Sequence, residues 1–498
     1  MLARQILVAA LALLTAFSAA AATRCDQILA RIGASLVAGD TLKCFDSTDL
    51  TTNNPLTTPA NNSLPPLPAG AWTPQTDRNV ISPDPPNRTP ITKAVPGVQL
   101  QGYLADDPTG EARFLLRLPD DWNGKLVVAG ASGTRSEFNG DFAWSDYVVQ
   151  KGYAYASQNK GVLNLKIVSL ASPTPPDSLS CRLNPASQIW VDFYDNAPDK
   201  PFTQWTQYMI IAGQLAQEGV KALYNHFPAR TYAVGTSNGG YQVRRAVEEA
   251  PNVFDGGVDW EGTFIDPSGP NILIDLPPAI ANWPAYLASG FNANSQAAQN
   301  IRAAGYPPDI VNGTTSFWGL YWAQFWEVTQ CQWQKRFDPT WVTYPDGPND
   351  ISGTGGYNYF TRVSQDPSIF AQVAAVATTG KIKRPLITVA GTMDALLPIE
   401  RGARAYEAVV DASRKGNNEH REAQFRLYEV QNGNHIETFK NTFAQLEFIQ
   451  PHAQKAFDLL VDHVENNAAL PPSQCIPRSG SIASKPAQPG HCANLFVP

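Results

Sequence analysis

The sequence predicts an α/β fold in which a doubly wound, mostly parallel sheet carries a large, mainly helical lid insertion. Short apolar runs that read as buried strands alternate with helix-period segments from Lys125 to Trp260, and the alternation resumes from Pro385 to Asn466. Residues 264–383, between these two parts, break the alternation. The eleven residues R-T-Y-A-V-G-T-S-N-G-G, Arg230–Gly240, lead from an apolar run into a helical one. Together these three observations indicate a sheet core interrupted by a lid.

Composition limits the possible functions. The chain has 498 residues, of which 43% are hydrophobic, so it can build a large core. The net charge is −7, and the sequence has no cluster of Lys and Arg residues that could contact a series of phosphates. Nucleic acid is a polyanion that recruits basic surfaces, so we expect no nucleic-acid partner.

The N-terminus reads as a secretory signal peptide over residues 1–22. Arg4 supplies positive charge, Ile6–Phe17 is apolar, and Ala20–Ala22 offers a small-residue cleavage site. The alternative is a membrane anchor, but the apolar stretch is short for a span. We therefore predict a secreted or periplasmic protein with no membrane span after signal cleavage.

The core elements follow in order. Residues 23–101 are rich in Pro and Thr and are predicted to form a strap over the body. Residues 102–263 are the first part of the core, with strands at Phe114–Leu118, Lys125–Gly130, Gly152–Ser157, Thr231–Val234 and Gly256–Trp260, and helices at Thr203–Phe227 and Tyr241–Ala250.

The predicted lid, residues 264–383, holds six of the twelve tryptophans: Trp283, Trp318, Trp322, Trp326, Trp333 and Trp341. Three of them, Trp318, Trp322 and Trp326, recur at the spacing of one helix face. For any single tryptophan, packing onto the core is the simpler explanation. The cluster as a whole favours an apolar, aromatic-lined pocket.

Residues 384–470 complete the core. Their predicted strands are Pro385–Gly391 and Phe425–Val430, and their predicted helices are Ile399–Ser413 and Thr438–Asn466. Residues 471–498 form a Pro- and Gly-rich tail.

An even number of cysteines in an exported chain favours disulfides. The six are Cys25, Cys44, Cys181, Cys331, Cys475 and Cys492. Six cysteines allow fifteen pairings. Short loops favour Cys25–Cys44 and Cys475–Cys492, which leaves Cys181–Cys331, and free buried thiols are the alternative. No spacing indicates a metal site, and no cofactor is expected.

The segment Gly235-Thr236-Ser237-Asn238-Gly239 fits the nucleophile-elbow pattern G-x-S-x-G, here between a strand and a helix. The serine occupies a strained turn, and the glycines let strand and helix pass closely. The backbone N–H of Asn238 would face a developing oxyanion at the positive end of the helix dipole. Ser237 is therefore the predicted nucleophile, although a plain strand-to-helix turn gives the same letters.

A serine nucleophile needs a base and an orienting carboxylate, and the chain supplies both in the order Ser, Asp, His. Asp394 follows one predicted strand and His435 the next, so both are expected at the sheet edge that carries Ser237. Asp394 also suits a helix cap, and Asp259 is the rival acid.

The second oxyanion donor is expected after the strand Lys125–Gly130. Its exit is rich in Gly and Ser, and a doubly wound sheet gathers ligands at such strand ends. Ser132 or Gly133 is the predicted donor, and an ordinary turn is an equal alternative.

The layout resembles the α/β-hydrolases and, within them, the tannase/feruloyl esterase group. The matching residues are Gly235-x-Ser237-x-Gly239-Gly240, Phe254–Gly257, Gly391-x-x-Asp394 and Asn432–His435. That group usually has cysteines at the positions of Thr236 and Ile436, which indicates a relative without that bridge. Secreted hydroxybutyrate-oligomer hydrolases are an equally open comparison.

The predicted function is a secreted serine carboxylic-ester hydrolase that acts on an apolar or aromatic ester, small or oligomeric. A serine peptidase or acyl transferase on the same fold is the first alternative. A non-catalytic secreted binding protein is the second. The sequence predicts no oligomeric state.

Overall fold

The computed structural model describes most of the chain beyond the predicted signal peptide, of which residues 1–21 lie outside the described residues. The described residues are 22–58, 87–107, 110–133, 137–138, 140–161, 166–177, 179–192, 202–341, 354–416 and 424–498.

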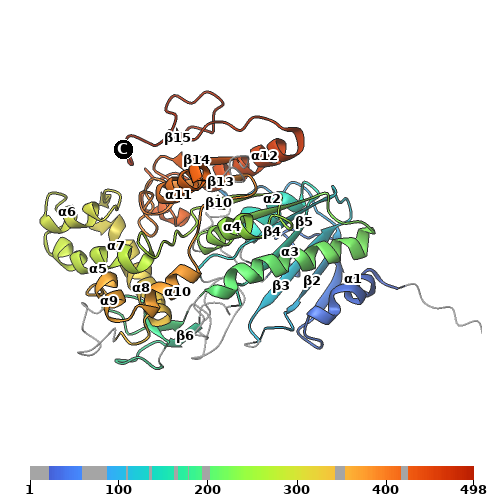
Figure 1. The fold of residues 1–498 in the computed structure, drawn as a ribbon, viewed down its shortest axis with the longest axis horizontal. Helices are drawn as coiled ribbons and strands as arrows, with labels where there is room; N and C mark the ends of the chain where they lie inside the picture. Colours follow the sequence, from blue (N-terminus) through green and yellow to red (C-terminus); the bar gives the residue numbers. More distant parts are fainter. Residues whose placement is uncertain are drawn as a thin grey trace, which may run out of the picture.

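A ten-stranded sheet runs through the molecule in the order β1-β2-β3-β5-β4-β9-β10-β13-β14-β15 (Figure 1). The strands are β1 (Lys43–Ser47), β2 (Gly97–Tyr103), β3 (Arg113–Pro119), β4 (Lys125–Ala129), β5 (Ala154–Gln158), β9 (Arg230–Thr236), β10 (Gly256–Trp260), β13 (Leu386–Gly391), β14 (Phe425–Val430) and β15 (Gln474–Ile476). The first three pairings along this order are antiparallel, and every pairing from β5 to β15 is parallel.

Helices cover both faces of the sheet. One face carries α1 (Arg24–Ile32), α3 (Thr203–Tyr224), α4 (Asn238–Glu249) and α11 (Ala403–Gly416), and the other carries the π-turn η3 (Asp141–Ser145), α2 (Asp146–Val149) and α12 (Gln450–Asn466). Successive strand residues point to opposite faces, so Val128 packs with the first helix set and Val127 with the second. Strands buried on both sides explain the continuous apolar runs, and the predicted fold class is confirmed.

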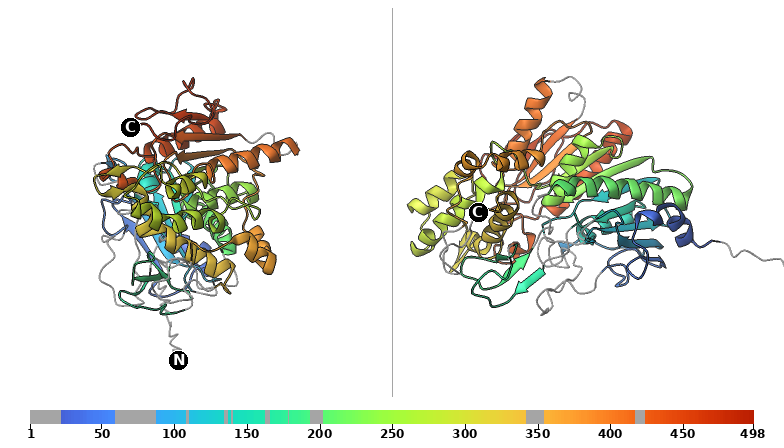
Figure 2. Two further views of the ribbon diagram at one scale, coloured as in Figure 1. Left: turned by 90° about the vertical axis from the view of Figure 1, so that its left-hand side faces the viewer. Right: turned by 60° about the horizontal axis from the view of Figure 1, so that its bottom comes forward.

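Helices dominate the segment between β10 and β13, at one end of the sheet (Figure 1). They are α5 (Ile272–Ala288), α6 (Gln296–Ala303), α7 (Phe317–Tyr321), the π-turn η4 (Trp322–Trp326), α8 (Glu327–Phe337), α9 (Tyr359–Gln365) and α10 (Ser368–Ala375). Two small sheets, β6 (Lys166–Ser169) with β7 (Cys181–Arg182) and β8 (Trp190–Asp192), and β11 (Val311–Asn312) with β12 (Thr315–Ser316), complete the fold. Seen from that end, the helices lie in front of the sheet (Figure 2, left).

Two helical predictions need correction. The closing helix predicted from Thr438 begins only at Gln450, after the short 3-10 turn η6 (Glu437–Asn441), because Pro451 favours the first turn of a helix. Trp318 lies in α7, whereas Trp322 and Trp326 lie in the π-turn η4, so the expected single helix face is broken there. The stretch 23–101 also contributes β1 and β2 to the main sheet.

The predicted disulfide pairings are all present: Cys25–Cys44, Cys181–Cys331 and Cys475–Cys492. Cys181–Cys331 ties the small β6–β8 sheet to α8 across 150 residues of sequence. A cross-link over so long a loop removes much conformational freedom from the unfolded chain. Among the described residues, no helix is long and apolar enough to cross a membrane.

Candidate active site

Ser237 lies in the turn between β9 and α4 with a backbone φ of 59°, a value that non-glycine residues rarely adopt. Its N–H donates to Trp260 O at 2.9 Å, which fixes the turn to the end of β10. A Cβ on Gly235 would lie 2.3 Å from Gly239 O, so only glycine allows strand and helix to approach this closely. The turn has the strain and the glycine requirement of a nucleophile elbow.

Asp394 and His435 meet at the same sheet edge. His435 Nδ1 lies 2.8 Å from Asp394 Oδ2, and both side chains are buried. The other carboxylate oxygen, Oδ1, accepts from Leu396 N and Leu397 N, each at 2.7 Å. Asp394 therefore both caps the following turn and contacts the imidazole. The two alternatives that the sequence offered for this residue, a cap and a partner of the histidine, are compatible.

The Ser237 hydroxyl and the His435 ring are not hydrogen-bonded to each other in the described structure, although both residues are within it. The two residues are connected indirectly through the end of β10. Ser237 N donates to Trp260 O, and the following residue, Glu261, has Oε2 at 3.4 Å from His435 Nδ1. Hydrogen bonds of this kind are often formed fully only with substrate present.

Glu261 is a second carboxyl group at the same imidazole nitrogen, and sequence reasoning missed it. Its Oε1 accepts from Gly391 N at 2.9 Å, while Oε2 is buried without a hydrogen-bond partner. Burial, followed by the charge of Asp394, raises the pKa of the Glu261 carboxyl well above its usual range. Its place immediately after a strand end was the available signal.

Asp259, the rival acid, points elsewhere. Its Oδ2 lies 2.5 Å from Arg244 Nε and accepts from Thr388 Oγ1 at 2.8 Å, and its Oδ1 accepts from Gly262 N at 2.6 Å. Both Asp259 and Arg244 are fully buried. The carboxylate is therefore the partner of a buried guanidinium on α4.

The loop after β4 lies against the elbow. A Cβ on Gly130 would sit 2.5 Å from Gly239 O, so the loop backbone and the start of α4 are in direct contact. Asn238, the first residue of α4, has an N–H without an intrahelical acceptor. The predicted donors Asn238 and Ser132–Gly133 therefore belong to two segments that pack against each other.

A buried lysine organises this loop. The Lys160 ammonium donates to Ala131 O at 3.1 Å, to Ser132 O and to Gly133 O at 3.3 Å. Three successive carbonyls thus turn toward one cation, which also lies 4.9 Å from the Trp205 ring centroid. Lys160 follows β5, but a lone lysine there carries no sequence signal for this role.

Replacing Lys160 by methionine is expected to lower kcat for ester turnover about tenfold to a hundredfold with little change in KM, because the loop that carries the predicted oxyanion donors loses its anchor. Steady-state kinetics on folded protein would measure this. Lys125→Met, at the opposite end of β4, is the matched control because that lysine pairs with Glu465. An unchanged kcat in Lys160→Met would contradict a role for this clamp.

Side chains of the helical segment contact both loops of the site. Trp326 Nε1 donates to Ala395 O at 2.7 Å, next to Asp394, and the Tyr321 hydroxyl donates to Asn434, next to His435. The tryptophans also pack on one another, with Trp283 and Trp322 stacked at a 5.6 Å centroid distance. Ser237 is only 6% exposed, and these helices contact the loops that carry Asp394 and His435.

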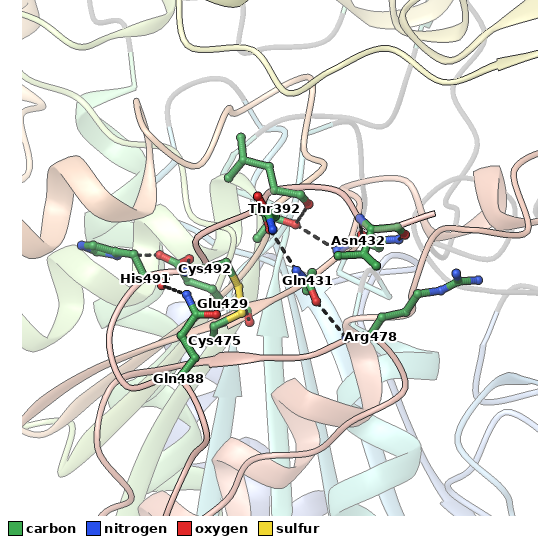
Figure 3. Close-up of a disulfide and its surroundings, with 12 residues drawn as sticks. Thr392, Glu429, Gln431, Asn432, Cys475, Arg478, Gln488, His491 and Cys492 are labelled. Atoms are coloured by element: carbon green, nitrogen blue, oxygen red, sulfur yellow. Dashed lines mark hydrogen bonds and ion pairs between the residues drawn. A yellow bond between two sulfur atoms is a disulfide. The ribbon is translucent and has the colours of Figure 1, made fainter.

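The C-terminal tail forms hydrogen bonds with the same two loops. Cys475–Cys492 lies beside Glu429, which accepts from Cys492 N at 2.7 Å (Figure 3). Asn432 exchanges two hydrogen bonds with Val497, at 2.6 and 2.8 Å. Thr392 Oγ1 donates to Leu495 O and accepts from Asn432 N. The tail therefore joins the loop of Asp394 to the loop of His435.

Glu261, Asp394 and His435 are also side chains of the kind that bind metals, with one ligand atom from each within 4.8 Å of the others. A ring nitrogen that donates its proton to Asp394 has no lone pair for an ion. With the proton on Nδ1, the 2.8 Å contact fits a carboxylate that orients the ring.

Comparison with known proteins gives a partial match to one family. Residues 354–495 match the family model described as 3HB-oligomer hydrolase. The chain is 36% identical over 126 residues to a D-(-)-3-hydroxybutyrate oligomer hydrolase of Burkholderia thailandensis, and 36% identical over 124 residues to that of Burkholderia ambifaria. In both cases the alignment covers 24% of this chain and only 17% of the relative. The predicted resemblance to the hydroxybutyrate-oligomer hydrolases is confirmed over this part.

Solved structures with related folds include two fungal enzymes. An esterase from Aspergillus oryzae aligns with a TM-score of 0.47 and 12% identity, covering 88% of this chain and 89% of its own. The tannin acyl hydrolase from Aspergillus niger aligns with a TM-score of 0.46 and 11% identity, covering 88% and 86%.

Proposed function

We propose that this protein is an exported carboxylic-ester hydrolase in which Ser237 is the nucleophile, His435 the base and Asp394 the orienting acid. The observation that carries the proposal is the 2.8 Å contact between His435 Nδ1 and Asp394 Oδ2, at the sheet edge where the strained Ser237 follows β9. The residues matched to the hydroxybutyrate-oligomer hydrolases include both Asp394 and His435.

The proposed reaction has two halves. His435 Nε2 takes the proton of the Ser237 hydroxyl as Oγ attacks the ester carbonyl, and the N–H groups of Asn238 and the Ser132–Gly133 loop stabilise the oxyanion. His435 then gives that proton to the leaving alcohol, which departs and leaves an acyl-enzyme. Water, deprotonated by the same ring, releases the acid and restores Ser237.

The proposed substrates are short oligomeric esters of hydroxy acids such as 3-hydroxybutyrate. The named relatives are hydrolases of such oligomers, and the match to the family model covers the segment that holds the base and the acid. Export is part of the proposal and is supported by three disulfides, which persist in oxidising compartments.

A substrate panel tests this proposal. We expect kcat/KM for 3-hydroxybutyrate dimers and trimers to exceed that for feruloyl and galloyl esters by at least about tenfold, because contacts to a matched ester are lost with a bulky aromatic acid. Peptide amides should not be cleaved. Products are followed by chromatography, and a preference for aromatic esters or for peptides would contradict the substrate or the reaction class.

A further inference from the structure

Two carboxyl groups from different strands meet one imidazole nitrogen. His435 Nδ1 lies 2.8 Å from Asp394 Oδ2 and 3.4 Å from Glu261 Oε2. The nitrogen carries one proton and can donate it well to one acceptor. Asp394, at the shorter distance, is that acceptor in this structure. The Glu261 carboxyl lies beside it and does not accept this proton.

The backbone fixes Glu261 in this place. Its φ of 50° is in the left-handed region, and its N–H donates to Val389 O at 2.9 Å. Its Oε1 accepts from Gly391 N, on the strand that leads to Asp394. A strained residue with one oxygen anchored and the other aimed at a functional side chain is typical of a functional constraint.

Two buried carboxyl groups that both contact one imidazole nitrogen do not both ionise readily. Glu261 and Asp394 are each nearly inaccessible to solvent, and burial together with the Asp394 charge raises the pKa of Glu261. A third buried carboxyl, Glu437, whose pKa burial raises to about 8, adds to that effect. Among the described residues, Tyr321, Tyr306 and Trp260 also interact with this cluster. In the resting site, Glu261 is therefore the neutral member of the pair.

We propose that Glu261 is a second positioning acid for His435: Glu261 and Asp394 share one negative charge beside Nδ1, and Glu261 assumes that charge when Asp394 is removed. This inference rests on the proposed function of His435 as the base. In the native cycle Asp394 balances the imidazolium, and Glu261 keeps its own proton. A single charge orients the ring, whereas a second one would hold the ring protonated and stop it from acting as a base.

The test is a double-mutant cycle between Asp394→Ala and Glu261→Gln. Alanine is chosen at 394 because, unlike asparagine, it presents no amide to Nδ1. We expect Asp394→Ala to lower kcat about a hundredfold, and Glu261→Gln to lower it about threefold in the native background but about thirtyfold or more in Asp394→Ala. Equal factors in the two backgrounds would overturn the proposal.

Glu248→Gln is the matched control. Glu248 is also a buried glutamate, but its Oε1 accepts from Gly380 N at 2.8 Å and from the Tyr406 hydroxyl at 2.9 Å, and it lies outside the Glu261, Asp394 and His435 cluster. A general effect of changing a buried carboxyl would make Glu248→Gln behave like Glu261→Gln. We expect the Glu248→Gln factor to be the same in both backgrounds.

The pH dependence gives a readout that a purely structural role would not change. Removing Asp394 removes a cause of the raised Glu261 pKa, so Glu261 ionises at lower pH in Asp394→Ala. The kcat of Asp394→Ala should then rise with pH as Glu261 loses its proton, in addition to the rise that the base His435 causes in every variant. Adding Glu261→Gln should leave only the His435 limb, and an unchanged pH profile would overturn the proposal.

A readout without turnover separates this inference from the proposed function. In a Ser237→Ala background, proton NMR follows the hydrogen-bonded ring N–H of His435, identified by its loss in His435→Gln. The resonance should persist in Asp394→Ala and vanish when Glu261→Gln is added, and the opposite result would refute the role of Glu261. Ester turnover that survives Ser237→Ala would refute the proposed function and leave the NMR result to decide on Glu261.

Discussion

Replacing Ser237 by alanine is expected to lower kcat for p-nitrophenyl butyrate and for 3-hydroxybutyrate dimers by at least about four orders of magnitude. Alanine removes the one oxygen that forms the acyl-enzyme, and His435 then has no nucleophile to activate. The strained turn itself should persist, because its N–H bond to Trp260 uses the backbone. Binding should therefore change little, and the loss should appear in kcat.

Fluorophosphonate labelling provides an independent measurement for this variant. The native protein should gain one adduct on the peptide that contains Ser237, and Ser237→Ala should gain none. Ser157→Ala is the matched control, because Ser157 is also buried and its hydroxyl has no hydrogen-bond partner to lose. Activity that survives in folded Ser237→Ala, or an adduct at another serine, would show that the nucleophile lies elsewhere.

Much of the sheet and its active-site edge could be predicted because both depend on local patterns. Strands buried on both faces produce continuous apolar runs, so β10 and β14 were predicted with the bounds that the structure gives them. Carboxyl ends of parallel strands meet at one edge, which is why Asp394 and His435, far apart in the sequence, could be expected to meet.

The remaining parts of the site depend on long-range contacts that no local pattern encodes. Glu261 and Lys160 act through groups on neighbouring strands and loops, and each is a single charged residue in its own segment. The tail contacts Asn432 and Thr392 only through backbone carbonyls and N–H groups, whose partners the side-chain sequence does not specify. Asp259 was a reasonable rival for the acid until Arg244 was placed beside it.

The two aspartates should respond to the same substitution in opposite ways. In Asp394→Asn, the amide oxygen can keep the bonds to Leu396 N and Leu397 N, so the fold should be retained. The amide nitrogen then faces His435 Nδ1 and favours the ring tautomer that cannot accept the Ser237 proton. We expect kcat to fall by about 10⁴-fold, with the melting temperature nearly unchanged.

Asp259→Asn should instead damage stability. It leaves the Arg244 guanidinium fully buried without a counter-charge, which costs about 3–5 kcal/mol in the free energy of unfolding. Because Asp259 does not touch the imidazole, kcat per fluorophosphonate-titrated site should stay within about tenfold of the native value. Denaturant unfolding and active-site titration of both variants measure the contrast. If Asp259→Asn abolished turnover per site while Asp394→Asn did not, the orienting acid would be Asp259, and the hydrogen bond between Asp394 and His435 would be structural.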